Sequence, residues 1–152
     1  MDVFTQEERS RVMSRVRSKN TKPELIVRHT AHRLGLRFRL HSKALPGIPD
    51  LVFRKYNSVV FVNGCFWHQH PGCKRATMPT SNRDFWRRKL MGNVSRDQEH
   101  VNELKRNGWR VLTIWECQTR QQEVVIEMLS EFFANKKTGI ESLMPVIGST
   151  LS

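Results

Sequence analysis

The sequence predicts a single mixed α/β domain in which helices flank a central sheet. A chain of 152 residues, 38% of them hydrophobic, is long enough for one compact core and too short for two full domains. Helical signals come first, three short apolar strands follow, and helices flank a fourth strand later in the chain. Elements in this order are typical of a sheet covered by helices.

The first helix of the domain is predicted from a capping box. Thr21 is followed three residues later by Glu24, and Pro23 between them favours a first helical turn. Gly35 is a typical residue just beyond a helix end, so we expect the helix to stop there.

An earlier helix is predicted from the same pattern at Thr5, but its composition is different. Its apolar stripe, which includes Met13, is too narrow for deep burial and is surrounded by Arg and Lys. Residues 1–20 are therefore predicted to form a basic arm that can order on DNA.

Three strands are predicted after this helical region. Residues 36–40 alternate between apolar and basic side chains, as in a strand with one basic face. Residues 51–54 and 58–62 are almost continuously apolar, which favours two buried strands. The short connection at 55–57 makes them a hairpin, with Asp50 at its entrance.

The second half of the chain begins with an irregular segment. Residues 64–78 are rich in Cys, His, Pro and Gly and show no periodicity, so a metal is the economical way to order them. The elements expected next are a helix opening at Ser81, a further helix ending at Gly108, a strand over 109–115 and a helix over 119–133. The domain is expected to span 21–135, followed by a polar tail over 136–152.

The charge of the chain favours a polyanionic partner. Lys and Arg number 26 against 14 Asp and Glu, which gives a net charge of +12 and a pI of about 10.5. Nucleic acid is the leading candidate, although ribosomal and membrane-surface proteins share such a charge. The first residues lack a secretory h-region and the apolar runs are too short to span a bilayer, so we expect a cytosolic, cytoplasmic protein and no membrane partner.

Cysteine and histidine spacing predicts a zinc site. Cys65, His70 and Cys73, together with Cys117 after the last predicted strand, would complete a tetrahedral Zn²⁺ site and leave no open position for catalysis. The site would be structural. His68 in place of His70, a chance cluster of buried cysteines and a redox pair are the alternatives.

The Pro49-Asp50 dipeptide lies at the mouth of the predicted hairpin, whose returning strand ends at Val62 and Asn63. Phosphodiester hydrolysis needs a carboxylate that holds a hard divalent cation. Asp also follows Pro in ordinary turns, so the dipeptide alone is weak evidence. Its place beside a buried strand pair in a basic protein makes Asp50 a candidate catalytic residue.

Two large aromatic residues and a histidine follow directly. Phe66 and Trp67 are either core residues or wedges that insert between DNA base pairs. His68 is either a buried structural histidine or a base of near-neutral pKa that takes a proton from water.

Three segments together resemble the very short patch repair (Vsr) DNA mismatch endonuclease family. They are LPGIPDLVF, VVFVNGCFWH and NGWRVLTIWEC, in this order and spacing, and the similarity extends from about Met13 to about Cys117. The resemblance implies a restriction-endonuclease-like fold, with 21–135 as the endonuclease domain. It also implies Mg²⁺-dependent nicking on the 5′ side of the T in a T:G mismatch that arises from 5-methylcytosine deamination.

The resemblance also implies roles for individual residues. Asp50 would bind Mg²⁺ with the carbonyl of Val62, and Glu24 would support the site through water. His68 would be the general base, oriented by Asp97. Neither Glu24 nor Asp97 stands out without the family.

The DNA contacts implied by the resemblance come from several segments. They are the stacking aromatics Phe66, Trp67 and Trp86, the inserted Met13, and Lys89 and Asn93 at the mismatched pair. The partner would be double-stranded DNA bound by a monomer, with mismatch-repair proteins as further partners.

The sequence departs from the family pattern at two places. Asn63 stands where another member has histidine, and an amide cannot titrate near neutrality, so any acid or base role there is lost. Pro71-Gly72 changes the spacing between His68 and Cys73 by one residue, which bears on His70 as a zinc ligand.

Two other functions fit the same residues. One is a nuclease of the same fold with a different DNA target, as in restriction or defence. The other is a zinc-stabilised DNA-binding module without catalysis, in which Asp50 would be unimportant.

Overall fold

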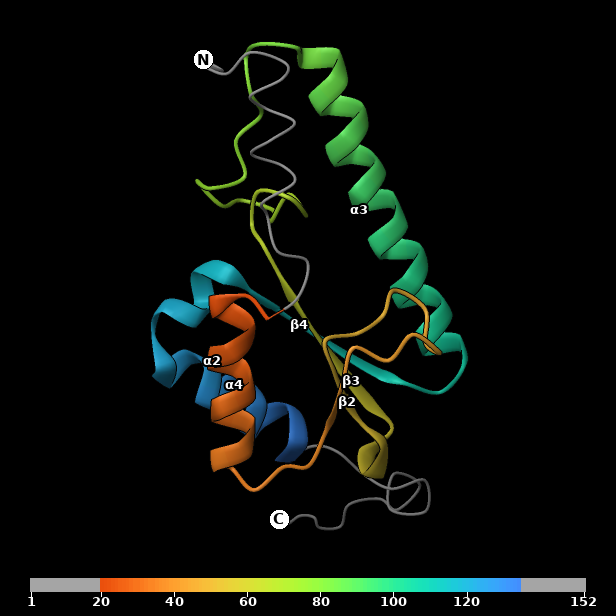
Figure 1. Cartoon of the computed structure of the whole chain (residues 1–152), viewed down its shortest axis with the longest axis vertical. Coiled ribbons are helices and arrows are strands. Elements are labelled where there is room, and N and C mark those ends of the chain that lie inside the picture. Colours follow the sequence, from red (N-terminus) through yellow and green to blue (C-terminus); the bar gives the residue numbers. More distant parts are fainter. Residues whose placement is uncertain (1–19, 135–152) are drawn as a thin grey trace.

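The computed structural model describes residues 20–134, which form a four-stranded sheet with helices on both faces (Figure 1). The strands are β1 (Arg39–Leu40), β2 (Leu51–Phe53), β3 (Ser58–Asn63) and β4 (Arg110–Trp115); the helices are α2 (Lys22–Arg33), α3 (Arg83–Arg106) and α4 (Gln122–Ala134), with short 3-10 turns η1 (Arg54–Tyr56) and η2 (Glu116–Arg120). The mixed α/β class is confirmed. The predicted arm, with Met13, and the tail beyond 134 lie outside the described residues.

The sheet has the order β1-β2-β3-β4, and only its last pair is parallel. The predicted hairpin is β2 and β3, closed by η1 and by Asn57 in the left-handed conformation. The strand expected over 36–40 is reduced to Arg39 and Leu40, because Leu36 and Phe38 pack against the core between the sheet and helices α2 and α4.

The alternation along the strands divides the core into two layers. Leu51, Val60 and Ile114 face α2 and α4, and they pack with Val27 and Leu129 of those helices. The intervening strand residues face the opposite way. Val52 and Val59 pack with Leu104 of α3, and Phe61, Trp109 and Val111 border this second layer. The face of the sheet toward α3 is therefore the one on which Asp50, directly before Leu51, can open into a cleft.

Helix α2 begins as predicted. Thr21 is its N-cap, and the Thr21 hydroxyl accepts a hydrogen bond from the Glu24 amide at 3.3 Å. The helix ends at Arg33, and Gly35 beyond it has a φ of +79°, the left-handed conformation that glycine adopts without strain.

Helix α3 corrects one expectation, because a single helix of 24 residues replaces the two that were predicted. Gly92 lies in its interior, where glycine costs about 1 kcal/mol relative to alanine. Burial of Trp86 and Leu90 before it and of Leu104 after it outweighs that cost. The helix is about 36 Å long, at about 1.5 Å per residue, so its N-terminal end extends past the sheet (Figure 1).

The last helix begins later than expected. Residues 116–120 form η2, and α4 starts at Gln122 and runs through Ala134. The predicted helix over 119–133 is therefore confirmed except for its first turn. None of the helices within residues 20–134 combines the length and apolar character needed to cross a membrane.

Candidate active site and Cys/His metal centre

A cleft of about 570 Å³ lies between α3 and the sheet. Its lining joins residues far apart in the sequence, namely Asp50 before β2, Asn63 at the end of β3, His68 in the irregular segment and Asp97 on α3. His41, in the loop between β1 and β2, also lines it. Four residues that the sequence analysis selected for chemistry therefore share one cavity.

Asp50 is held by the neighbouring strand of the hairpin. Its Oδ2 accepts a hydrogen bond of 2.7 Å from the backbone amide of Val62. The pKa of Asp50 is raised from 3.8 to about 6, mainly by burial and also by nearby Glu24, and this value includes the opposing effects of the Val62 hydrogen bond and the histidines at 41 and 68. A bound cation would offset this penalty, because it stabilises the carboxylate.

Glu24 approaches Asp50 from α2 on the other side of the sheet. It is 1% exposed, its Oε1 accepts a hydrogen bond from the Asn20 amide at 2.9 Å, and its Oε2 pairs with Arg28 and with His41. One ligand atom from each of Glu24, His41 and Asp50 lies within 4.8 Å of the other two. Carboxylate oxygens suit Mg²⁺ and Mn²⁺, so this cluster fits a divalent cation.

His68 and Asp97 form a pair within the same cleft. The His68 Nδ1 and the Asp97 Oδ2 are 2.6 Å apart. A carboxylate at Nδ1 fixes the proton there and leaves Nε2 free to accept one, the arrangement that a general base needs. The histidine whose ligand atom lies in the Cys/His cluster is His70, not His68.

The four residues predicted to bind zinc converge in the structure. The Nδ1 of His70 is 3.7 Å from Cys65 Sγ and 3.5 Å from Cys117 Sγ, and ligand atoms of Cys65, His70, Cys73 and Cys117 all lie within 4.8 Å of one another. The three cysteines are free thiols. Three sulfur atoms and one imidazole nitrogen fit tetrahedral Zn²⁺, with no position left for a substrate.

Strand register explains why distant cysteines meet. Asn63 pairs with Trp115 at the end of the parallel strands β3 and β4. Cys65 lies two residues after Asn63 and Cys117 two residues after Trp115, so both cysteines leave the sheet at the same edge. Burial raises the pKa of Cys65 to about 12, whereas a backbone hydrogen bond from Arg75 lowers that of Cys73. A metal that displaces the protons would stabilise Cys65 as a buried thiolate.

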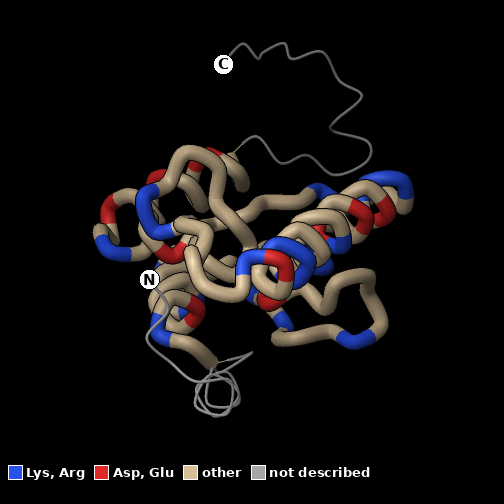
Figure 2. Tube along the Cα trace, turned by 90° about the horizontal axis from the view of Figure 1, so that it is seen from above, with Lys and Arg blue, Asp and Glu red and all other residues tan. Residues whose placement is uncertain are grey.

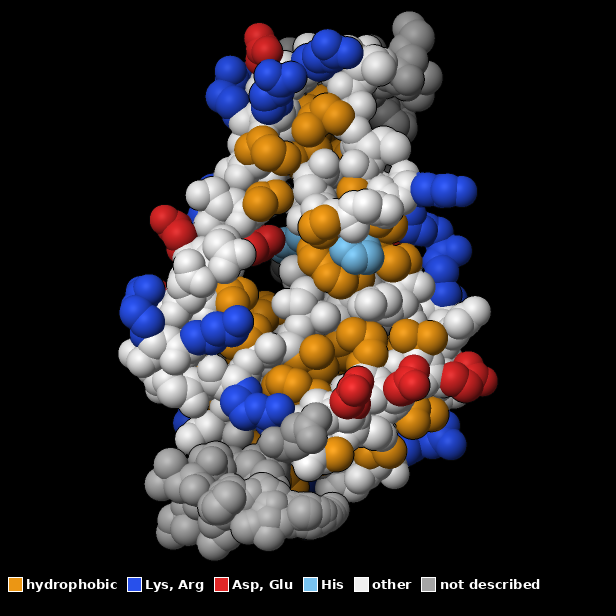
Figure 3. Space-filling view, turned by 180° about the vertical axis from the view of Figure 1, so that it is seen from behind, with side chains coloured by type: hydrophobic (Ala, Val, Ile, Leu, Met, Phe, Trp, Pro, Cys, Tyr) orange, Lys and Arg blue, Asp and Glu red, His pale blue; other side chains and the backbone are white. Residues whose placement is uncertain are grey.

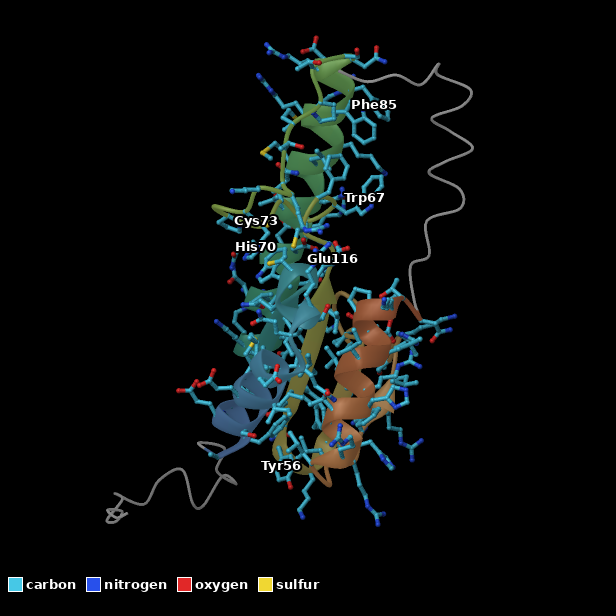
Figure 4. All side chains as sticks on the ribbon, turned by 90° about the vertical axis from the view of Figure 1, so that its left-hand side faces the viewer. Tyr56, Trp67, His70, Cys73, Phe85 and Glu116 are labelled. Atoms are coloured by element: carbon cyan, nitrogen blue, oxygen red, sulfur yellow. The ribbon has the colours of Figure 1, made fainter. Side chains whose placement is uncertain are left out.

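The neighbours of this cluster fix its orientation. The His70 ring stacks on Trp115, with centroids 4.2 Å apart and planes at 9°. Glu116 accepts a hydrogen bond from the Cys65 amide at 3.4 Å. His70, Cys73 and Glu116 lie close together in Figure 4, at the end of β4. The cluster thus joins the irregular segment to the sheet.

Aromatic side chains form a second group beyond the cleft. Phe66 packs edge-on against Trp67, at 5.0 Å between centroids, and both contact Trp86 of α3. Trp86 is 6% exposed and supports the other two from beneath, whereas the adjacent Phe85 is 40% exposed. Figure 4 shows Trp67 and Phe85 on one side of α3. Phe85 neighbours Trp86 in the chain, but no pattern in the sequence indicates a role for it.

The two polar residues expected at the mismatched pair differ in their surroundings. Lys89 is exposed on α3. Asn93 donates a hydrogen bond from Nδ2 to the Trp67 carbonyl at 2.9 Å, and its Oδ1 accepts one from Arg96 at 2.6 Å. In this structure Asn93 therefore fixes the backbone at Trp67. To contact a DNA base, its side chain would have to give up its hydrogen bond with Trp67 or with Arg96.

Basic residues accompany the aromatics. Figure 3 shows Lys and Arg gathered at the end of the molecule where α3 begins, next to apolar side chains. Arg83, Arg87, Arg88 and Lys89 are exposed there. A half-buried aspartate and a paired histidine in one cleft, bordered by exposed aromatic and basic residues, are the arrangement expected of a nuclease.

The chain belongs to the DNA mismatch endonuclease Vsr family. The family model described as DNA mismatch endonuclease Vsr matches residues 1–75. The Type II nicking enzyme V.XorIIP of Xanthomonas oryzae is 48% identical over 117 residues, which cover 77% of this chain and 85% of that protein.

Two further relatives extend the similarity. The Type II nicking enzyme V.NmeAIP of Neisseria meningitidis is 39% identical over 139 residues, covering 91% of this chain and 99% of its own. The DNA mismatch endonuclease Vsr of Escherichia coli is 38% identical over 122 residues, covering 80% and 78%. The nuclease class agrees with the names of this family and of its members.

Proposed function

We propose that this protein repairs T:G mismatches by nicking one DNA strand on the 5′ side of the T, in a Mg²⁺-dependent hydrolysis that leaves a 3′-hydroxyl and a 5′-phosphate. The observation that carries the proposal is the cleft in which Asp50 and the His68–Asp97 pair lie together. The names of the relatives, which include a mismatch endonuclease and nicking enzymes, support a cut in one strand at a mismatch.

The residues around Asp50 would hold the cation. Asp50 and the carbonyl of Val62 would be ligands, and Glu24, which is buried beside them, would act through water. When bound, the ion polarises the scissile phosphate and stabilises the leaving oxygen. The Asp50 carboxylate is suited to this role because the Val62 amide fixes its orientation before any substrate binds.

His68 would take the proton from the attacking water. Its Nδ1 contact with Asp97 fixes the tautomer and stabilises the imidazolium that forms. Asn63 lines the same cleft and can position a water through its amide, but it cannot exchange a proton near neutral pH. Proton transfer on this side of the cleft therefore depends on His68.

The aromatic residues would select a distorted duplex. Phe66 and Trp67 would stack on bases at the mismatch, and Trp86 would support them from α3. Unstacking costs least where pairing is already imperfect, which favours a mismatch over matched DNA. Residues 1–20, including Met13, would act as a basic arm against the opposite groove, and Zn²⁺ at the Cys/His cluster would hold the segment that presents Phe66 to His68.

A strand-resolved cleavage assay tests the proposal. T:G and matched duplexes with randomised flanks, labelled separately on each strand, would be incubated with and without Mg²⁺. We expect cleavage of the T strand of the T:G duplex only, and only with Mg²⁺. Asp50→Asn, which keeps an oxygen for the Val62 amide, should lower the rate by at least about 100-fold.

Asp84→Asn on the exposed first turn of α3 is the matched control and should cleave like the wild type. Equal cleavage of matched duplex would replace mismatch repair by a nuclease of another specificity. Binding without any nicking, or an Asp50→Asn variant as fast as the wild type, would instead leave a zinc-stabilised DNA-binding module.

A further inference from the structure

His41 has an unusual backbone conformation beside the cleft. Its φ is +46°, a region that L-amino acids rarely adopt, and its amide donates a hydrogen bond to the Asp50 carbonyl at 3.2 Å. Ile48, in the same loop between β1 and β2, also has a positive φ. Such conformations persist where the surrounding structure imposes them, and they concentrate at functional sites.

This conformation directs the His41 side chain toward two carboxylates. The His41 Nε2 is 2.6 Å from the Glu24 Oε2, and its side chain is 18% exposed. Ligand atoms from Glu24, His41 and Asp50 converge within 4.8 Å. The imidazole therefore lies at the point where a cation bound by Asp50 would be found.

The ion pairs around Glu24 argue against a purely electrostatic role for His41. Arg28 already binds the Glu24 Oε2 through its guanidinium, which supplies a full positive charge. The Asn20 amide occupies the Glu24 Oε1. Neutralising Glu24 thus does not require a second cation, whereas a neutral imidazole can offer a nitrogen lone pair to a metal ion.

We propose that His41 is a nitrogen ligand of the divalent cation at Asp50, which makes the site a mixed nitrogen and oxygen site. This inference rests on the proposed role of Asp50 in cation binding. On cation binding, the His41 Nε2 would exchange its contact with the Glu24 Oε2 for the ion. Imidazole favours transition ions over Mg²⁺, so the site binds Mn²⁺ more tightly than Mg²⁺, and His41 is a source of that preference.

Electron paramagnetic resonance of Mn²⁺ tests the ligand directly, without DNA or turnover. The untagged full chain, first saturated with Zn²⁺ so that the cysteine cluster is filled, would be titrated with Mn²⁺ and then with competing Mg²⁺. Pulsed measurements would detect ¹⁴N coupled to Mn²⁺. We expect a directly coupled nitrogen in the wild type and displacement of Mn²⁺ only by a large excess of Mg²⁺.

The informative variant is His41→Asn, because asparagine tolerates the left-handed conformation at this position. We expect it to lose the ¹⁴N coupling and to bind Mn²⁺ on the order of tenfold more weakly, with a smaller preference over Mg²⁺. Its zinc content and circular dichroism should match the wild type. His32→Gln, on the exposed face of α2, is the control and should leave both signals unchanged.

Three results would overturn the inference: no coupled nitrogen in the wild type, coupling that survives in His41→Asn, or coupling lost only in His68→Gln. The proposed function fails separately. If Asp50→Asn binds Mn²⁺ as tightly as the wild type, Asp50 is not a cation ligand, whatever His41 does.

Discussion

Asp50 lowers the stability of the folded protein when it is ionised. Its folded-state pKa is about 6 against 3.8 for the exposed group, mainly because of burial. The folded state therefore holds this proton more tightly than the unfolded state does. Below pH 4 Asp50 is protonated in both states and imposes no cost on folding. As the pH rises through about 6, the free energy of unfolding falls, because the folded state must give up this proton. Above about pH 6, ionised Asp50 therefore lowers the free energy of unfolding by about 3 kcal/mol, because its pKa differs by about 2 between the folded and unfolded states.

We predict that Asp50→Asn is more stable than the wild type at neutral pH. Asparagine keeps an acceptor for the Val62 amide and removes the buried charge, so its advantage should approach about 3 kcal/mol at pH 8. The advantage should grow by about 1 kcal/mol between pH 5 and pH 7. Urea unfolding of both proteins across this range, without added divalent cations, measures it.

At each pH, the free energy of unfolding of Asp50→Asn is compared with that of the wild type, so the effects of ionisable groups that both proteins contain cancel in the difference. Added Mg²⁺ should narrow the gap by stabilising only the wild type, since the cation offsets the buried charge. A variant less stable than the wild type at pH 8 would show that the Asp50 carboxylate does not carry this penalty.

Single residues differ in how far the sequence predicts their roles. Asp50 could be selected because it directly precedes a recognisable strand, and His68 because it follows two large aromatic residues. Glu24 and Asp97 came only from the family resemblance, since helix caps and exposed helix carboxylates look alike in sequence. His41 was missed, because its role depends on a left-handed turn and on an α2 carboxylate 17 residues earlier, and no periodicity indicates either.

Among the elements, the segment 64–78 depends most on its cross-links. It contains no helix or strand, and its contacts with the sheet include the Cys65–Cys117 pair and the stacking of His70 on Trp115. Lys74 and Arg75 are exposed within it. The backbone hydrogen bonds within it form local turns between residues three to five apart, so the segment should lose its order first when the cross-link is removed.

We predict one tightly bound Zn²⁺ per chain, whose removal loosens this segment. Chelation should lower the melting temperature by on the order of 10 °C, which corresponds to a loss of several kcal/mol. It should also accelerate tryptic cleavage after the exposed Lys74 and Arg75, because the backbone around them would become mobile enough to enter the protease. Metal analysis, thermal melting and mass mapping of the first cleavage sites check both effects.

Restoring Zn²⁺ to the chelated protein should reverse both changes, and Mg²⁺ should not. Cleavage after Lys105 and Arg106, at the end of α3, is the internal control and should keep its rate. A metal-free protein with an unchanged melting temperature and unchanged cleavage would show that hydrogen bonds alone hold the cluster.

Elements were predictable where one local signal dominated. The Thr21 cap and the apolar hairpin strands were correct because each is fixed by neighbours in sequence. The strand over 36–40 was wrong in extent, because Leu36 and Phe38 pack in the core without pairing with β2. The expectation of two helices between Ser81 and Gly108 was wrong, because burial on both sides of Gly92 holds α3 together.

At the scale of the whole molecule, charge is distributed unevenly along α3. Lys and Arg occur on most elements, with Asp and Glu among them (Figure 2). Residues 83–89 carry four cations and one anion, a net charge of +3, whereas residues 96–106 carry three of each, a net charge of zero. The basic half is also the half beside Phe66 and Trp67. The total of +12 therefore does not reveal which surface meets DNA.

We predict that the N-terminal half of α3 makes direct phosphate contacts. Arg87→Gln with Arg88→Gln should weaken binding to a T:G duplex and lower the slope of log affinity against log salt by about 2, since each lost contact removes about one unit. Fluorescence anisotropy in Mg²⁺-free buffer, at about 50 to 200 mM salt, measures the slope without cleavage.

The matched control is Lys105→Gln with Arg106→Gln, at the other end of the same helix. Both double variants lower the net charge from +12 to +10, so a general electrostatic attraction would affect them equally. Counterion release requires close contact with phosphate, and the second pair lies roughly 27 Å farther along α3, at about 1.5 Å per residue. The slope of log affinity against log salt for Lys105→Gln with Arg106→Gln should therefore equal that of the wild type. Equal losses in the two variants would mean that DNA is attracted by the total charge and that this end of α3 is not its binding surface.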